Sequence, residues 1–141
     1  MAPGITDRLK YFYESCETLK SLKKKYTLNE IESNRDLCDI MERNFEKMIV
    51  ASVDIVNYYI AEKKLPKPKS YVESFFVLSD AAGLIKTEEK QIFKEFVENR
   101  NIITHEYFSV NYEKIYSLLD HIPILISLIE KITSQIDITE I

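Results

Sequence analysis

The fold is decided by residues 34–64, which read NRDLCDIMERNFEKMIVASVDIVNYYIAEKK. Either Ser33 or Asn34 suits the N-cap position, because its side chain can accept a hydrogen bond from a backbone amide of the first turn. The residues that follow repeat at intervals of three and four, which predicts one long helix running to about Lys64. The repeat forms two neighbouring seams, one of Leu37, Met41, Asn44, Met48, Ser52, Ile55 and Tyr59, the other of Ile40, Ile49, Val53, Val56 and Ile60.

This largely apolar surface is wider than one core contact requires. A helix with such a surface is either deeply buried or serves a core and a subunit interface at once, and the sequence leaves both possibilities open. Asp54 lies amid the surface. We expect its carboxylate to hydrogen-bond inside the bundle rather than to touch an active site, since buried polar groups are usually paired.

The flanking segments show the same helical periodicity. Pro66 and Pro68 cannot continue the long helix, because neither has a backbone N–H to donate. Pro123 lies inside the last periodic segment and predicts a kink or a local break there. The expected helices are residues 5–26, a short helix after the capping box Thr27–Glu30, a helix from the capping box Ser70–Glu73 to Gly83, a helix that begins at Thr87, and a last helix from Asn111 to Ile132.

Short connections between helices favour antiparallel neighbours. We therefore expect an all-α fold, an antiparallel up-down bundle of four main helices plus short ones, with no sheet. The 141 residues suit one domain, 1–141. With only 2 Gly and 4 Pro the chain has few turn residues, which argues against a small all-β fold.

The formal charge of −4 disfavours a nonspecific grip on nucleic acid, so any RNA chemistry needs a locally basic site. The run Lys23–Lys25 closes a predicted helix, and we interpret it as a solvated helix end, with an RNA-contacting patch as the alternative. The two cysteines, Cys16 and Cys38, have neither a CxxC spacing nor a nearby histidine, so we expect reduced apolar side chains and no metal site. The N-terminus carries no signal pattern and no apolar run could span a membrane, so we expect a cytoplasmic protein.

One segment, residues 99–107 (NRNIITHEY), concentrates groups that can carry chemistry. Asn101 and His105 are four residues apart and share a helix face. Arg100 and His105 are five apart, so their side chains diverge by roughly 140° on an ideal helix. They can meet at one reacting atom only if the helix distorts or if two copies of the chain face each other. A purely structural role is the alternative, with Arg100 paired to Glu95 or Glu98 and His105 placed as a cation at the helix end.

The spacing Arg100-x4-His105-x-Tyr107 resembles the Arg-x4-His-x-Tyr signature of HEPN domains, in particular the HepT-like toxins. The resemblance continues outside this motif and covers about residues 5–132. Residues 54–62 are similar to the long second helix of that family, and residues 110–116 to the start of its final helix. The helix and turn that come next in the family are similar to residues 68–71 of this chain, together with Phe75, Leu78 and residues 82–83.

The resemblance implies a HEPN-like bundle that forms a homodimer in which the Arg/His motifs of two subunits face each other. It implies a metal-independent endoribonuclease without a cofactor, the toxin of a type VII-like toxin–antitoxin system. Carried over by position, Arg100, His105 and Asn101 would be catalytic. The implied partner is an MntA-like nucleotidyltransferase antitoxin, which binds the toxin and transfers AMP to Tyr107.

The residue types suit RNA cleavage without a metal. Histidine titrates near neutral pH and can transfer protons to and from the reacting oxygens. Arginine stays charged and presents a planar fork to phosphate oxygens. One motif supplies one histidine, whereas two facing motifs supply one for each proton-transfer step. AMP on Tyr107 would place a bulky anion beside the cationic site and repel RNA.

Two other functions remain open from the sequence. The first is a non-catalytic subunit that binds a nucleotide or presents a substrate to a nucleotidyltransferase, which the acidic charge and the single histidine per motif favour. The second is a plain structural dimerisation module. RNA cleavage that depends on His105 would distinguish the ribonuclease from both of these alternatives.

Overall fold

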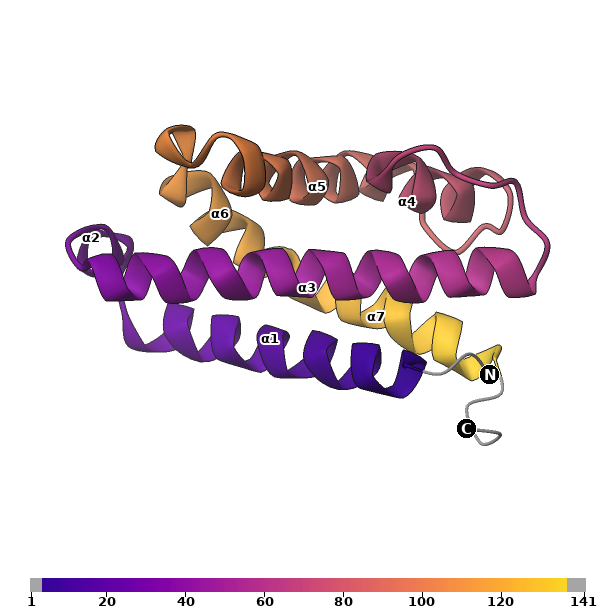
Figure 1. Cartoon of the computed structure of the whole chain (residues 1–141), viewed down its shortest axis with the longest axis horizontal. Coiled ribbons are helices and arrows are strands. Elements are labelled where there is room, and N and C mark those ends of the chain that lie inside the picture. The colour runs from indigo at the N-terminus through magenta and orange to yellow at the C-terminus, as the bar shows by residue number, and fades with distance from the viewer. Residues whose placement is uncertain (1–3, 137–141) are drawn as a thin grey trace.

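The computed structural model describes residues 4–136, and every regular element within that range is helical. Figure 1 shows their order along the chain. The elements are α1 (Ile5–Lys25), α2 (Leu28–Glu32), α3 (Arg35–Glu62), α4 (Tyr71–Asp80), η1 (Thr87–Glu89), α5 (Lys90–His105), η2 (Tyr107–Ser109), α6 (Tyr112–Leu118), η3 (Leu119–His121) and α7 (Ile122–Ser134).

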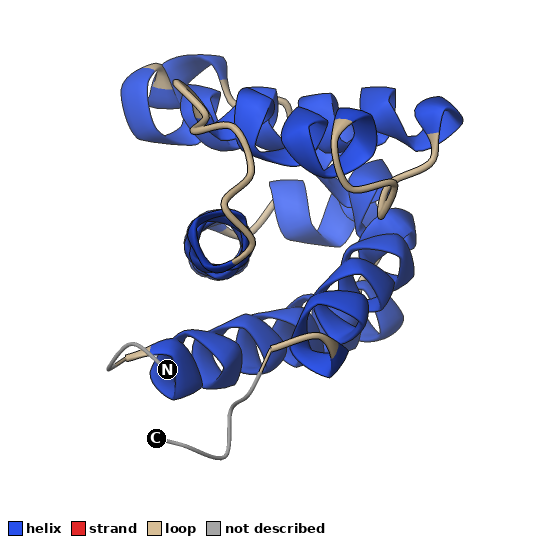
Figure 2. Cartoon of the chain, turned by 90° about the vertical axis from the view of Figure 1, so that its right-hand side faces the viewer, coloured by secondary structure: helices blue, strands red, loops and turns tan. Residues whose placement is uncertain are grey.

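The long helix α3 is the centre of the bundle. It packs against α1 on one side and against α4 and α5 on the other, and it also contacts α7. In Figure 1 successive long helices α1, α3 and α5 alternate in direction, and α6 and α7 run behind α3. Figure 2, viewed along α3, shows its neighbours above it, below it and to its right. The predicted all-α antiparallel bundle is therefore confirmed.

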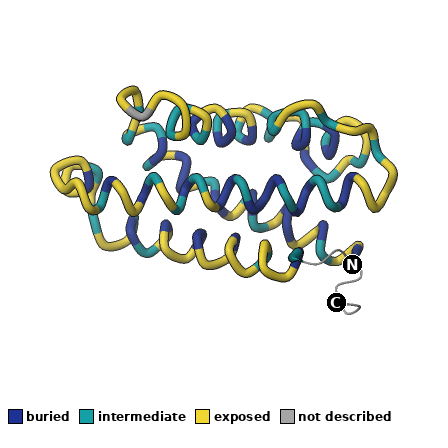
Figure 3. Tube along the Cα trace, in the orientation of Figure 1, coloured by how far each residue is buried: buried dark blue, intermediate teal, exposed yellow. Residues whose placement is uncertain are grey.

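Most of both seams of α3 is buried within the single chain, although Leu37 and Asn44 of the first seam are only half-buried. Met41, Met48 and Ile55 of the first seam are fully buried, and Val53 and Val56 of the second are equally inaccessible. Of the second seam only Ile40, 41% exposed, lies at the surface. Figure 3 shows buried positions repeating along the whole of α3. The chain's own helices thus cover the wide apolar surface, and the first of the two possibilities raised by its width, deep burial, accounts for it.

Local signals set the ends of the central helices as the sequence predicted. Asn34 caps α3 by accepting from the amides of residues 36 and 37. Its C-terminus closes with a pair of backbone bonds, from the Leu65 amide to the Ile60 carbonyl (2.9 Å) and from the Lys64 amide to the Ala61 carbonyl (3.2 Å). Lys64 takes a left-handed conformation, φ +54°, which this helix-ending motif requires. The prolines then lead the chain away.

Helix α4 is fixed at both ends and along its length. The Ser70 side chain accepts from the Glu73 amide at 3.1 Å, and Gly83, with φ +67°, lets the chain turn after the helix. The Ser74 hydroxyl donates to Asn57 of α3 at 2.7 Å, and the Phe75 ring packs 4.9 Å from that of Phe93 in α5. These contacts hold the N-terminus of α4 against the middle of the bundle.

Two of the expected helices differ in detail from the observed ones. The α-helix expected from Thr87 begins with a 3-10 turn, and α5 itself starts at Lys90. The last helix is broken as Pro123 predicted, since η3 separates α6 from α7 and the proline lies in the first turn of α7. A proline is tolerated there because amides of the first turn have no partner within the helix.

The two cysteines are buried, and Lys23 of the run Lys23–Lys25 is engaged in contacts within the fold. Cys16 and Cys38 are free and buried, and burial raises the pKa of the Cys16 thiol to about 12. Lys23 is not freely solvated, because its ammonium pairs with Asp120 at 2.9 Å and donates to the Tyr116 carbonyl at 2.7 Å. Among residues 4–136, none of the helices combines the length and hydropathy that a membrane crossing demands.

Candidate active site

The residues singled out by the sequence lie on the second half of α5 and just after it. Helix α5 stays α-helical through His105, and the Glu106 amide still donates to the Ile102 carbonyl at 2.7 Å. The five-residue offset therefore keeps Arg100 and His105 roughly 140° apart around the axis. The helix is not distorted, so a bent helix, one of the two conditions under which these groups could meet at one reacting atom, is not observed.

Arg100 is half-buried and makes none of the ion pairs that a structural role predicts. Glu95 pairs instead with Lys114 at 3.1 Å, and no carboxylate within residues 4–136 lies at salt-bridge distance from Arg100. The Arg100 guanidinium carbon lies 5.0 Å from the centre of the Tyr71 ring. Its Nη1 donates to the Asn101 side-chain oxygen at 3.2 Å, whereas Nε is buried without a hydrogen-bond partner among the described residues.

His105 and Asn101 are both exposed, and His105 is the last residue of α5. That position also fits the alternative of a cation at the helix C-terminus, since the last carbonyls favour positive charge. Tyr107 begins η2, two residues further along, but its side chain lies outside the part of the chain that the structure describes.

Thr104 ties the motif to the central helix. Its hydroxyl contacts the Glu46 carboxylate of α3 and also donates to the Arg100 carbonyl at 3.1 Å. Neither Glu46 nor Tyr71 was singled out from the sequence, because each contacts the motif from a different helix. A periodic pattern assigns a residue to a face of its own helix but does not identify its neighbour in the fold.

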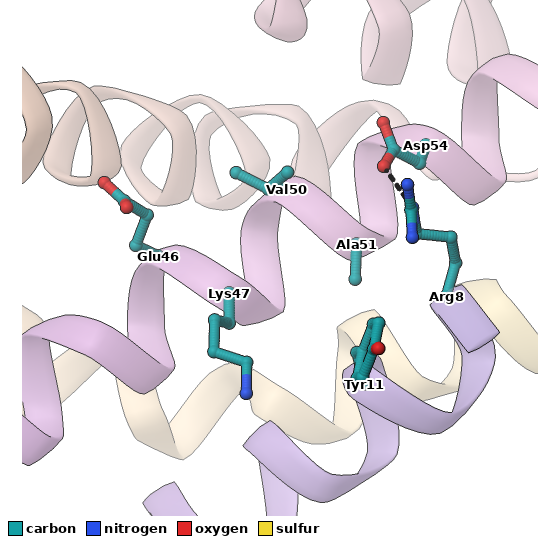
Figure 4. A pocket seen from close by; sticks show the side chains of 7 residues that line it. All are labelled: Arg8, Tyr11, Glu46, Lys47, Val50, Ala51 and Asp54. Carbon is teal, nitrogen blue, oxygen red and sulfur yellow. Dashed lines mark hydrogen bonds and ion pairs between the residues drawn. The ribbon is translucent and has the colours of Figure 1, made fainter. Parts of the chain in front are cut away.

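Glu46 also lines a hollow of about 270 Å³ between α1 and α3. Figure 4 shows this hollow, which is bordered by Arg8, Tyr11, Glu46, Lys47, Val50, Ala51 and Asp54. Arg100 and His105 are not among its lining residues. Asp54 pairs here with Arg8 of α1 at 2.8 Å. The expected hydrogen bond therefore exists, but it lies at the surface rather than inside the bundle, since the Asp54 side chain is 40% exposed.

A polar cluster holds the chain that follows the motif. The Tyr112 hydroxyl, at the start of α6, donates to the Glu42 carboxylate of α3 at 2.6 Å, and Arg35 contacts the same carboxylate at 2.7 Å. Burial, together with the bond to Glu42, raises the pKa of Tyr112 to about 12. The bond from this phenol to Glu42 ties the start of α6 to α3.

Among residues 4–136, no group of three or more His, Cys, Asp and Glu side chains is arranged to hold a metal ion. The groups gathered on α5 are instead a guanidinium without a carboxylate partner, an amide and an exposed imidazole. Such a set can bind a phosphate and transfer protons.

The chain belongs to the HepT-like ribonuclease family, whose model matches residues 12–132. The matched range includes the central helix α3 and the whole of α5 with its motif. No curated protein is significantly similar to the chain in sequence.

Solved structures share the fold at low sequence identity. A tri-AMPylated HEPN toxin of Shewanella oneidensis in complex with MNT antitoxin is 20% identical, with a TM-score of 0.81, over 96% of this chain and 100% of that one. A toxin–antitoxin structure with AMP-PNP is 21% identical, with a TM-score of 0.78, over 94% of this chain and 99% of that one. A Bacillus subtilis cytosolic protein of unknown function, YutE, is 18% identical, with a TM-score of 0.76, over 92% of this chain and 86% of that one.

Proposed function

We propose that this chain is the toxin of a toxin–antitoxin pair and a metal-independent endoribonuclease, acting in the cytoplasm as one domain, 1–141. The proposal is carried by one observation: in this member of the HepT-like ribonuclease family, Arg100 has no carboxylate partner among the described residues. Its guanidinium is half-buried, yet none of the described carboxylates neutralises it. A cation left unpaired on an acidic protein is a site for an anion, and the phosphate of RNA fits its planar fork.

In the proposed mechanism, two copies bring their motifs together. One His105 accepts the proton of the ribose 2′-hydroxyl, whose oxygen attacks the adjacent phosphorus. The other His105 donates a proton to the leaving 5′-oxygen, so the proton count balances and a cyclic phosphate forms. Arg100 binds the phosphate oxygens, whose negative charge increases in the transition state. Asn101 is exposed beside Arg100 and can orient His105 or donate to the phosphate.

The test in cells compares wild type with His105→Ala. Expression of the wild type should arrest growth and degrade RNA, and the variant should do neither. The matched control is His121→Ala, which changes the other of the 2 histidines in the chain and should stay toxic. Equal toxicity and equal RNA decay for wild type and His105→Ala would refute catalysis by this motif.

We further propose that Tyr107 accepts AMP from a nucleotidyltransferase antitoxin of the MntA type. The phenol oxygen would attack the α-phosphorus of ATP, forming a phosphodiester and releasing pyrophosphate. Structures of HEPN toxin with MNT antitoxin and of a toxin–antitoxin pair with AMP-PNP, both of the same fold, support this partner class. We expect intact mass to rise by one or more AMP groups after incubation with antitoxin and ATP. Tyr107→Phe should gain none, and an unchanged wild-type mass would count against the proposal.

A second function rests on the formal charge of −4. An acidic surface suits a non-catalytic subunit that binds a nucleotide or a substrate for its nucleotidyltransferase partner. In that case the purified protein should leave RNA intact and bind nucleotide in a way that requires Arg100.

A further inference from the structure

The guanidinium of Arg100 is held by an aromatic ring rather than by a carboxylate. Its central carbon lies 5.0 Å from the centre of the Tyr71 ring, within the range of a cation–π contact. Its terminal Nη1 is bonded to the exposed Asn101, and among the described residues Nη2 has no hydrogen-bond partner; unlike Nε, it is not a buried atom. The group is therefore fixed on one side and open at its end.

We propose that Tyr71 is the positioning residue for Arg100, holding the guanidinium so that its terminal nitrogens receive an RNA phosphate. The expected effect of Tyr71 on RNA cleavage rests on the proposed ribonuclease function. The contact between the two side chains exists whether or not RNA is cleaved, so the two claims can be tested separately.

The position of the Tyr71 ring is set by its surroundings. Tyr71 is the first residue of α4, directly after the Ser70 cap. One turn further on, the Ser74 hydroxyl bonds to Asn57 of α3 at 2.7 Å. These two contacts fix the start of α4, and with it the ring on which Arg100 lies. Because a tyrosine side chain has few rotatable bonds, a fixed backbone leaves its ring little freedom.

A ring has an advantage over a carboxylate as a support for this arginine. A carboxylate would neutralise the charge, and a phosphate would have to displace it. A tyrosine ring attracts the cation through its quadrupole and leaves the net charge in place. On a chain of formal charge −4, this keeps a locally positive point where RNA must bind.

The geometry also predicts how the phosphate approaches. Nε is buried, so an oxygen cannot reach the side of the fork that joins Nε to a terminal nitrogen. The phosphate must bind end-on, through Nη1 and Nη2. The bond from Nη1 to Asn101 is at the surface, where an incoming phosphate oxygen can replace it.

The first experiment compares Tyr71→Leu, Tyr71→Phe and the matched control Phe76→Leu. Phe76 is on the same helix and also lies under a cation, Lys90, 4.6 Å from its centre, so its loss imitates the structural cost without touching Arg100. We expect Tyr71→Leu to cleave RNA about tenfold more slowly than wild type, the scale of a partly buried cation–π contact. Tyr71→Phe keeps the ring and should stay within about twofold, and Phe76→Leu should cleave at the wild-type rate. Equal rates for Tyr71→Leu and Phe76→Leu would overturn the assignment.

The second experiment needs no activity. The chain has 4 arginines, so the side-chain Nε–Hε region of an ¹⁵N spectrum is simple. The Arg100 signal, identified with Arg100→Lys, should be shifted by the Tyr71 ring current in wild type and in Tyr71→Phe, and should move toward the exposed arginines in Tyr71→Leu. An Arg100 signal at the same chemical shift in wild type and in Tyr71→Leu would refute the contact itself. Loss of cleavage in Tyr71→Leu but not in Arg100→Lys and Arg100→Ala would refute the proposed role of Arg100 instead.

Discussion

Purified His105→Ala protein should cleave RNA about 10²–10⁴ times more slowly than the wild type, the usual contribution of a positioned proton-transfer group. The imidazole is exposed at the end of α5, so its removal opens no cavity and should leave the unfolding midpoint close to that of the wild type. Cleavage of a labelled RNA in the presence of a chelator measures the rate. His121→Ala, which changes a half-buried histidine elsewhere in the bundle, is the control and should retain activity.

Arg100→Ala should lose activity on a similar scale, because it removes the group proposed to bind the phosphate. Unlike His105→Ala, it should also weaken binding of uncleavable RNA. Activity of either variant within a few-fold of the wild type, in a protein of unchanged stability, would contradict the proposed site.

Replacing Phe93 with alanine should reduce the free energy of unfolding by about 3–5 kcal/mol, the range observed for large aromatic deletions in cores. Phe93 is 1% exposed and its ring lies 4.9 Å from Phe75 and 6.5 Å from Phe96. The three rings join α4 to α5, so their contacts hold the helix that carries the motif. Denaturant unfolding followed by circular dichroism measures the change.

The control for Phe93→Ala is Ile40→Ala, which shortens a side chain of α3 that is 41% exposed. We expect a loss of about 1 kcal/mol or less there, because surface substitutions rarely cost more. If the two variants were equally stable, the aromatic contact between α4 and α5 would not be a stabilising part of the core.

Local signals made most of the fold predictable. The caps at Asn34 and Ser70, the turn at Gly83 and the break at Pro123 all act within a few residues of where they occur in the sequence. The 3-10 turn at Thr87 was not foreseen, since the side-chain pattern there suits either type of helix.

The surroundings of the motif were less predictable, because they depend on packing between distant segments. Glu95 is five residues from Arg100, yet its carboxylate pairs with Lys114 on α6. Arg100 lies instead on Tyr71, whose position depends on how α4 docks against α3. Proximity in the sequence suggested a carboxylate partner for Arg100, whereas in the fold its guanidinium lies against the Tyr71 ring.

The width of the apolar surface on α3 gave an ambiguous signal for the same reason. From the sequence it suited either a deeply buried helix or a helix shared with a second subunit. Val53 and Val56 are fully buried within one chain, so the surface is used in forming the monomer. The reason to expect two copies is therefore chemical, since Arg100 and His105 diverge on an undistorted α5.

The most direct test of this account is the cleavage rate of a mixed dimer. One wild-type chain and one His105→Ala chain with different tags can be made together by cell-free synthesis and isolated through both tags. If two facing motifs share one site, with one histidine for each proton transfer, the mixed dimer should cleave RNA far more slowly than half the wild-type rate. A mixed dimer with half the wild-type rate would show that each chain acts alone, and would contradict the shared site.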